Sequence, residues 1–292
     1  MILSPDNAKL MSDSEFILFR DMIYNHCGIF FSEDSKYLLE KRLEKRLIIL
    51  NLQCFREYFQ YLKYGRNRDQ EMMDVMDILT TNETYFFREL FQLKAFTDEI
   101  IPELIKKKAA QGSRSLRIWS AGCSTGEEPY TISMLIREQS ALSGWNIEII
   151  GTDISQRVLQ FARHGVYNKA SFRATEEQYV KRFFTEQADG YRINDDIKEP
   201  VTISHLNMYD SDRIALLGHM DVIFCRNVII YFDLNSKKKV VSAFHNSLAE
   251  GGFLLLGHSE SLMNISTQFT LRHFKNDMIY QKPGRVVLGG LI

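Results

Sequence analysis

One stretch of the sequence, residues 116–153, constrains the fold more than any other. It opens with an apolar run typical of a buried strand, followed by the glycine-containing turn Ala121–Gly126. A helix with a proline in its first turn comes next, and a second strand, Asn146–Thr152, leads into Asp153. Because strands that alternate with helices usually pair in parallel, this stretch predicts an α/β fold with a mostly parallel sheet.

The turn and the acid after the second strand predict a site for a nucleoside-type ligand. Glycine lets the backbone approach a ligand closely, and Asp153 can accept hydrogen bonds from both hydroxyls of a ribose. The turn lacks the Gly-x-Gly-x-x-Gly pattern of dinucleotide sites, and Glu127 and Glu128 at the helix start would repel a pyrophosphate. Two carboxylates suit a cation such as S-adenosylmethionine, which carries a sulfonium, an ammonium group and a ribose. An ordinary strand–helix–strand unit with capping acids is the alternative interpretation.

Composition sets the broad class. The chain of 292 residues is 45% hydrophobic and 25% charged, as in globular proteins of one or two domains. A net charge of -1 gives no general reason to expect binding to nucleic acid or membranes. The 4 cysteines are too widely spaced to form a metal-ligand pair, so we expect no metal and reduced thiols in a cytoplasmic protein. We also expect neither a signal peptide nor a membrane-spanning helix.

The first part of the chain is expected to be helical. Apolar spacing predicts helices over residues 14–25, 36–50, 54–64 and 70–79. In the second of these helices, leucines at helical spacing form one buried stripe, Leu39, Leu43, Leu47 and Leu50.

Basic residues are concentrated on that same helix. Lys41, Arg42 and Lys45 are expected to project away from the leucine stripe, and Arg46 to lie at its edge. The pattern leaves two interpretations open, a solvated helix face or a docking surface for an acidic partner.

Several longer motifs follow one another in a recognisable order: Thr80–Glu89, Ile118–Tyr130, Gly151–Ile154, Cys225–Asp233 and Gly257–Glu260. Together they resemble the bacterial chemotaxis receptor methyltransferases of the CheR type. The resemblance implies a signalling enzyme that uses S-adenosylmethionine to methylate glutamate side chains in the cytoplasmic helical region of chemoreceptors, with S-adenosylhomocysteine as the second product. It also implies an N-terminal helical domain with its linker (residues 1–95). A doubly wound, Rossmann-like class I methyltransferase domain (96–292) would follow, with a small antiparallel β subdomain inserted at about 166–200.

The resemblance also implies residue roles. Glu128 would take the ammonium group of the cofactor, Asp153 the ribose hydroxyls, and Asn207 and Met208 would flank the adenine. The complete set implied to bind the cofactor is Asn82, Thr84, Arg88, Ala121, Gly122, Glu128, Asp153, Asn207, Met208, Arg226 and Asn227. Arg88 and Tyr231 are implied to be catalytic. The local positive charge makes Lys41, Arg42, Lys45 and Arg46 candidates for docking the receptor, whose helices would carry several glutamates.

The chemistry demands little acid or base catalysis. A glutamate, with a pKa of about 4.3, is already ionised near neutral pH, so alignment and exclusion of water remain as the enzyme's tasks. Whether Arg88 contacts the acceptor or the cofactor stays open at this point. Asp233 and Tyr231 belong to the same motif, but only Tyr231 is placed near the methyl acceptor.

Other functions are compatible with parts of the sequence. A related enzyme acting on a non-receptor protein would carry the same motifs, and a non-catalytic module that binds S-adenosylmethionine would keep Glu128 and Asp153. Gly257–Ser261 lacks the second glycine of a hydrolase elbow. The connection 185–190 is short and acidic, and Asp189-Gly190 is typical of a tight hairpin turn. We therefore predict no dependence on a receptor tail peptide.

Overall fold

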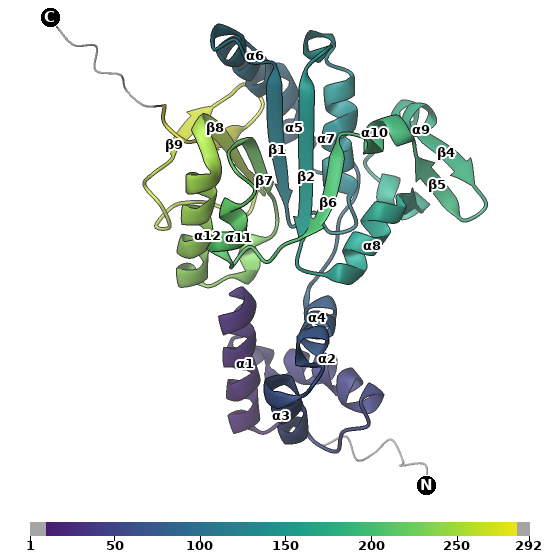
Figure 1. Cartoon of the computed structure of the whole chain (residues 1–292), viewed down its shortest axis with the longest axis vertical. Coiled ribbons are helices and arrows are strands. Elements are labelled where there is room, and N and C mark those ends of the chain that lie inside the picture. Colours follow the sequence, from purple (N-terminus) through teal and green to yellow (C-terminus); the bar gives the residue numbers. More distant parts are fainter. Residues whose placement is uncertain (1–9, 285–292) are drawn as a thin grey trace, which may run out of the picture.

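The computed structural model describes residues 10–284, and these form a helical part and an α/β part (Figure 1). Residues 1–9 and 285–292, which the predicted domain limits include, lie outside the described residues. Within residues 10–284, no helix is both long and apolar enough to cross a membrane. The prediction that the first domain and its linker end at residue 95 stays a prediction.

The helical part is built around aromatic and leucine side chains. Its elements are α1 (Asp13–Cys27), a 3-10 turn (Glu33–Ser35), α2 (Lys36–Ile49), α3 (Phe55–Tyr64) and α4 (Arg68–Leu79). In α1, Ser12 and Glu15 form a capping box, and the helix ends at Gly28 in the left-handed conformation. The ring of Phe19 packs against those of Phe55 and Tyr58 of α3. The four predicted helices are therefore confirmed, with ends shifted by one or two residues.

The basic face of α2 is less open than the sequence predicts. Lys41 and Lys45 are exposed, as expected. The guanidinium of Arg42, however, donates a hydrogen bond to the carbonyl of Leu79, at the end of α4. This carbonyl is one of the last four of its helix and has no partner within it, so it attracts the long side chain. Arg42 is therefore half-buried and held against α4, and it offers a partner less surface than Lys41 and Lys45.

Arg46 is also engaged inside the helical part. Its Nη2 lies 2.6 Å from a carboxylate oxygen of Glu71 and 2.5 Å from one of Asp74, and Tyr58 donates to the same Glu71. Only 14% of the Arg46 side chain is exposed. Arg46 therefore joins α2 to α4 and offers little surface to a partner.

The main sheet has the order β6-β2-β1-β7-β8-β10-β9 in the described residues. Its parallel strands are β1 (Ser115–Ala121), β2 (Asn146–Asp153), β6 (Val201–His205), β7 (Met220–Cys225) and β8 (Leu248–Leu256). The antiparallel pair β9 (Thr270–His273) and β10 (Met278–Gln281) closes one edge. The predicted α/β fold with a mostly parallel sheet is confirmed.

Helices cover both faces of this sheet, as in a doubly wound fold. One face carries α5 (Leu90–Ala95), the π-helical turn Phe96–Ile100, α6 (Ile101–Ala110) and α7 (Glu127–Arg137). The other carries α11 (Ser211–Ala215) and α12 (Leu234–Ser247), and α8 (Gln156–His164) follows β2. Neighbouring residues of β1 point to opposite faces. Ile118 lies in the core under α6 and α7, and the Trp119 ring packs edge-on against Phe244 of α12.

The predicted β subdomain is confirmed and projects from the side of the molecule (Figure 1). It contains α9 (Glu177–Phe183), the short α10 (Asp195–Lys198) and a sheet in the order β3 (Val166–Tyr167), β5 (Gly190–Ile193) and β4 (Phe184–Gln187). Gln187 pairs with Gly190, so the turn residues are Ala188 and Asp189. The prediction of a turn at Asp189-Gly190 is thus one residue too late. Gly190, with φ of 148°, begins β5, where a Cβ atom would lie 2.6 Å from the Tyr167 carbonyl oxygen.

The helical part joins the sheet at the carboxyl ends of the strands. After α1, Ile29 forms an isolated antiparallel bridge with Phe232, and the Tyr24 hydroxyl donates to Asp233. On the other side, Asp77 of α4 accepts a hydrogen bond of 2.6 Å from Ser155, just after β2. The two parts therefore enclose the strand ends between them.

Candidate functional site

A cleft of about 380 Å³ lies between the helical part and the carboxyl ends of β1, β2 and β7. Its lining brings together nearly all the predicted cofactor and catalytic residues: Asn82, Thr84, Arg88, Gly122, Glu128, Asp153, Asn207, Met208, Arg226, Asn227 and Tyr231. Ala121 is not among the lining residues, because its side chain is buried in the core on the α12 face of the sheet. The strand ends in a parallel sheet are where ligands generally bind.

The glycine turn after β1 is closely packed. The amides of Gly122 and Cys123 donate to the Thr152 carbonyl at the end of β2, with distances of 2.7 and 2.8 Å. Gly122 has a φ of 79°, and a Cβ atom there would lie 2.6 Å from a methyl carbon of Val228. The turn thus needs glycine at this position both for its conformation and for contact with the loop after β7.

Replacing Gly122 by alanine should therefore disturb the cleft as well as the backbone. Gly144 offers a matched control, because its φ is 75° and a Cβ atom there would meet nothing within 4 Å. Each alanine should cost about 1–2 kcal/mol for the left-handed conformation. Only Gly122→Ala should also lower the affinity for the ligand of the cleft, since the methyl group must displace Val228. Equal ligand affinity in the two variants, measured by calorimetry, would contradict this.

Asp153 is held in one orientation at the end of β2. One carboxylate oxygen accepts the Ser124 amide and the other accepts the Ser155 amide, both at 2.9 Å. Burial raises the pKa of Asp153, and the two amides oppose that shift only in part. Each oxygen has further lone pairs that can accept hydrogen bonds from a ligand. A carboxylate kept buried at such a cost is typical of a binding site.

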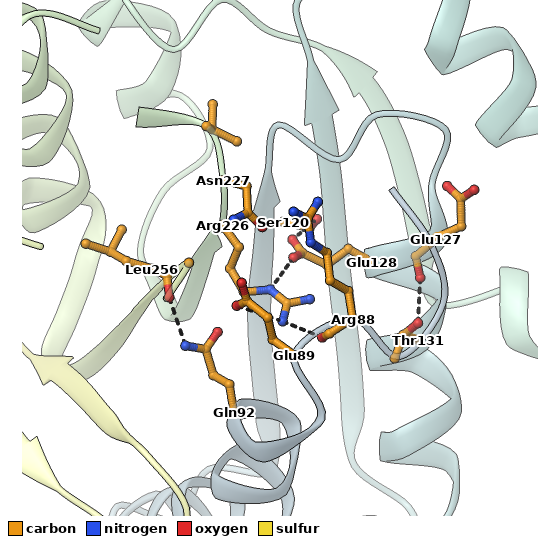
Figure 2. A network of polar contacts seen from close by, with 12 residues as sticks. Arg88, Glu89, Gln92, Ser120, Glu127, Glu128, Thr131, Arg226, Asn227 and Leu256 are labelled. Carbon is orange, nitrogen blue, oxygen red and sulfur yellow. Dashed lines mark hydrogen bonds and ion pairs between the residues drawn. The ribbon is translucent and has the colours of Figure 1, made fainter. Parts of the chain in front are cut away.

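Glu128 lies in a network that includes Arg226 at the end of β7 (Figure 2). One oxygen of Glu128 accepts the Ser120 hydroxyl at 2.7 Å, and the other lies 2.6 Å from Nε of Arg226. The same arginine donates to the Arg88 carbonyl at 2.7 Å and lies 3.6 Å from the carboxylate of Glu89. Arg226 therefore ties β7 to the segment that carries Arg88, and its guanidinium is engaged by protein groups.

The neighbouring Glu127 has a different environment. Its carboxylate accepts hydrogen bonds from Thr125 at 2.6 Å and from Ser171 at 3.1 Å, and burial raises its pKa. Ser171 belongs to the β subdomain insertion. Glu127 thus joins the start of α7 to the subdomain, and the cleft receives only Glu128 of the acidic pair.

The two predicted catalytic residues line the same cleft from different elements. Arg88 is half-buried, and its side chain donates to the Glu83 carbonyl at 2.9 Å. Tyr231 ends the 3-10 turn Ile229–Tyr231 after β7 and is 38% exposed, so a macromolecule can reach it. Their catalytic roles stay predictions.

Asn207 and Met208 follow β6, and both line the cleft. The side chain of Asn207 is held by two hydrogen bonds. The Asn207 amide donates to the His26 carbonyl at 2.6 Å, and its oxygen accepts the Tyr209 amide. Asn207 therefore fixes the end of α1 against the sheet. Its predicted contact with an adenine would have to use what remains of its hydrogen-bonding capacity.

Sequence reasoning gave no role to two acids that organise this region, Glu89 and Glu260. Glu89, at φ of 57°, accepts the His258 amide and faces Arg226. Glu260 accepts backbone amides of the loop that carries Asn227 and Tyr231. The two acids end the motifs Thr80–Glu89 and Gly257–Glu260. Their partners Arg226 and Asn227 lie in a distant part of the sequence, so local sequence patterns do not indicate these contacts.

Family comparisons agree with this geometry. The model "CheR methyltransferase, SAM binding domain" matches residues 82–278, and "CheR methyltransferase, all-alpha domain" matches residues 14–80. The chain belongs to the CheR methyltransferase family. The CheR-family resemblance noted in the sequence is thereby confirmed.

Curated relatives cover almost the whole of this CheR-family chain. Chemotaxis protein methyltransferase 2 of Vibrio cholerae is 38% identical over 279 residues, 95% of this chain and 96% of the relative. Chemotaxis protein methyltransferase 1 of Pseudomonas aeruginosa is 34% identical over 276 residues, 92% and 98% of the two chains. A chemotaxis protein methyltransferase of Borreliella burgdorferi is 35% identical over 244 residues, 82% and 86%.

S-adenosylmethionine is the cofactor of this CheR-family methyltransferase, and the cleft fits it. Asp153 presents free lone pairs to hydroxyl groups, and Glu128 presents a carboxylate to an ammonium group. The side-chain oxygen of Asn227 is buried at the cleft and has no hydrogen-bond partner among residues 10–284. A buried polar atom without a partner is costly, and a bound donor would satisfy it.

Proposed function

We propose that this CheR-family methyltransferase transfers the methyl group of S-adenosylmethionine to glutamate side chains of methyl-accepting chemoreceptors, in the cytoplasm. The observation that carries the proposal is that Tyr231 and Arg88 line the same cleft as Asp153, while Tyr231 stays accessible from outside. Cofactor and acceptor can therefore meet in one cleft. The printed names of the relatives, chemotaxis protein methyltransferases, supply the receptor as the acceptor.

The site residues suit a reaction that needs positioning more than proton transfer. When bound, S-adenosylmethionine supplies a methyl group on a positively charged sulfur atom, and S-adenosylhomocysteine remains after the transfer. A receptor glutamate, with a pKa of about 4.3, attacks as the carboxylate without a general base. Arg88 and Tyr231 both line the cleft in which this carboxylate must be placed. A tight ion pair with Arg88 would weaken the nucleophile, so we assign the orienting hydrogen bond to Tyr231.

The test is methylation of receptor-containing membranes with methyl-labelled S-adenosylmethionine. We expect label on the receptor that is released by mild base, because a carboxyl ester is base-labile and a methylated nitrogen is not. Base-stable label would contradict glutamate methylation. Label on another cellular protein, with none on receptors, would favour the alternative of a non-receptor substrate. Cofactor binding without transfer would indicate a regulatory module.

The exposed lysines of α2 are the remaining candidates for electrostatic docking of the receptor. Lys41 forms an exposed pair with Glu44, and Lys45 is exposed; Arg42 and Arg46 are engaged internally. We expect Lys41→Glu/Lys45→Glu to slow receptor methylation at low salt and to leave cofactor affinity intact. Wild-type activity should fall as salt rises, because exposed charges are screened beyond about 10 Å at 0.1 M salt.

A matched control reverses two exposed lysines elsewhere, Lys106 on α6 and Lys238 on α12. This control changes the net charge by the same amount but leaves α2 intact. Equal methylation by the two double variants at low salt would contradict docking through α2.

The β subdomain supports recognition without a receptor tail peptide. Strand addition needs an open edge and a loop that lets another backbone approach. The hairpin here has only Ala188 and Asp189 in its turn, and the edge strand β4 carries the exposed Glu186. We expect no micromolar binding of receptor tail peptides in calorimetric titrations. Micromolar binding that is lost on substitution within residues 185–193 would show that a tail site exists.

A further inference from the structure

We propose that Glu260 is a positioning residue for methyl transfer: its carboxylate fixes the loop 227–231 and thereby places Tyr231 at the acceptor side of the cleft. Glu260 lies in the turn after β8 and does not line the cleft itself. The inference rests on the proposed function, because it concerns the same reaction. It extends that function to a residue outside the cleft.

The Glu260 carboxylate accepts four backbone amides from two separate segments. One oxygen accepts the Asn227 and Gly257 amides, each at 2.7 Å. The other accepts the Val228 amide at 2.9 Å and the Ile230 amide at 3.2 Å. Three of these four donors belong to the loop after β7, 30 to 33 residues away in sequence. A single side chain therefore holds most of the loop's amide groups.

The loop needs such support because its own conformation is unusual. Asn227 has φ of 61°, a left-handed conformation that is uncommon for residues other than glycine. The following 3-10 turn, Ile229–Tyr231, is only three residues long. A bound carboxylate satisfies amides that this short turn leaves without backbone partners. The Glu260 contacts thus fix the loop up to Ile230, and Tyr231 follows directly, with its carbonyl accepting the Phe30 amide at 3.2 Å.

Gly257 completes the same cradle. A Cβ atom there would lie 2.7 Å from Nδ2 and 2.8 Å from the backbone nitrogen of Asn227, and 2.9 Å from a Glu260 oxygen. Gly257 is buried, so nothing larger than its hydrogen fits between the two segments. The turn and the loop can therefore approach closely because Gly257 has no side chain and Glu260 binds the loop amides.

This arrangement is separate from the groups that hold Asp153. The Asp153 carboxylate is fixed by the amides of Ser124 and Ser155, whereas Glu260 accepts amides of residues 227, 228, 230 and 257. Loosening the loop should consequently move the acceptor side of the cleft more than the ribose side. We expect a large fall in kcat for receptor methylation and a smaller loss of S-adenosylmethionine affinity, because Asn227 and Val228 of the same loop also line the cleft.

Glu260→Gln is a sharp test because it keeps the size of the side chain. It replaces one acceptor oxygen by an NH2 donor and removes the negative charge. An amide oxygen can keep two of the four contacts, but its NH2 group then faces two backbone N–H donors. Amide hydrogen exchange over residues 227–231 should become about tenfold faster. Because a displacement of about 1 Å can cost 100-fold in rate, kcat should fall by about that factor.

Glu103→Gln is the matched control. Glu103 pairs with Arg272 at 3.2 Å and accepts Gln281, away from the cleft. The Glu103→Gln variant should keep the wild-type rate of amide hydrogen exchange over residues 227–231 and the wild-type kcat. A lower melting temperature alone would mark a purely structural role for Glu260. The proposal is overturned if exchange over 227–231 is unchanged, or if the loop is loosened and kcat is retained.

Gly257→Ala keeps the proposal testable if Glu260→Gln does not fold. Its added methyl group would collide with Asn227 of the same loop, while the Glu260 side chain stays chemically unchanged. The variant should likewise show faster amide hydrogen exchange over residues 227–231 and a lower kcat. Retained kcat in a folded Gly257→Ala with a loosened loop would overturn the proposal. If the wild-type enzyme methylates no receptor glutamate, the proposed function fails, whereas the exchange measurement still tests whether Glu260 orders the loop.

Discussion

Asp153→Ala should reduce the affinity for S-adenosylmethionine by two to four orders of magnitude. In the proposed site, Asp153 accepts two hydrogen bonds from ribose hydroxyls, and the loss of each hydrogen bond to this charged acceptor should cost about 1.5–3 kcal/mol. The substitution also frees the amides of Ser124 and Ser155, which the carboxylate holds at 2.9 Å. Calorimetric titration with the cofactor measures the change directly.

Asp210→Ala provides the control for that experiment. Asp210 caps the short helix α11 by accepting the Arg213 amide, and it lies outside the cleft lining. It should cost about 1 kcal/mol of stability and no cofactor affinity. An unchanged dissociation constant for Asp153→Ala would remove Asp153 from the binding site.

Arg226→Met should lower the free energy of unfolding by about 3–5 kcal/mol. Only 3% of the Arg226 side chain and 12% of the Glu128 side chain are exposed, so the substitution leaves Glu128 buried without its partner. Glu89, with 11% of its side chain exposed, also loses its nearest cation. Urea unfolding with an unchanged m value measures the loss.

A second substitution separates the ion pair from other effects of Arg226→Met. In the double variant Arg226→Met/Glu128→Gln, the unpaired charge of Glu128 is removed. The double variant should therefore be more stable than the two single effects together predict, by about 1 kcal/mol or more. Strict additivity would mean that the pair is not coupled, although Nε of Arg226 and a Glu128 oxygen are 2.6 Å apart.

The sequence allowed the elements with strong local patterns to be predicted. The strand, glycine turn and helix of residues 116–137 appear as β1 and α7. They could be predicted because an apolar run and turn residues are signals that involve only a few neighbouring positions. The carboxyl ends of the parallel strands then bring Gly122, Asp153 and Asn227 into one cleft. Helices α5, α6 and α12 were not among the predicted elements, although they cover the sheet.

Side-chain partners were harder to predict because they join distant segments. Helical spacing placed Arg42 away from the leucine stripe of α2 and Arg46 at its edge, but the groups that bind them belong to α4. The motif likewise assigns Arg226 to the cofactor, whereas in the structure its guanidinium contacts Glu128 and the Arg88 carbonyl. Periodicity gives the face of a helix, not the charge that the next element presents to that face.

Methyl transfer to receptor glutamates is tested most directly by identifying the residue that carries the methyl group. Purified enzyme, S-adenosylmethionine and a soluble receptor helical fragment are incubated, and the fragment is sequenced by tandem mass spectrometry. We expect methyl esters on glutamate side chains of the fragment, each seen as the added mass of CH2, and none with Asp153→Ala at the same enzyme and cofactor concentrations. Methyl groups on lysine, arginine or histidine, or equal glutamate methylation by wild type and Asp153→Ala, would contradict this expectation.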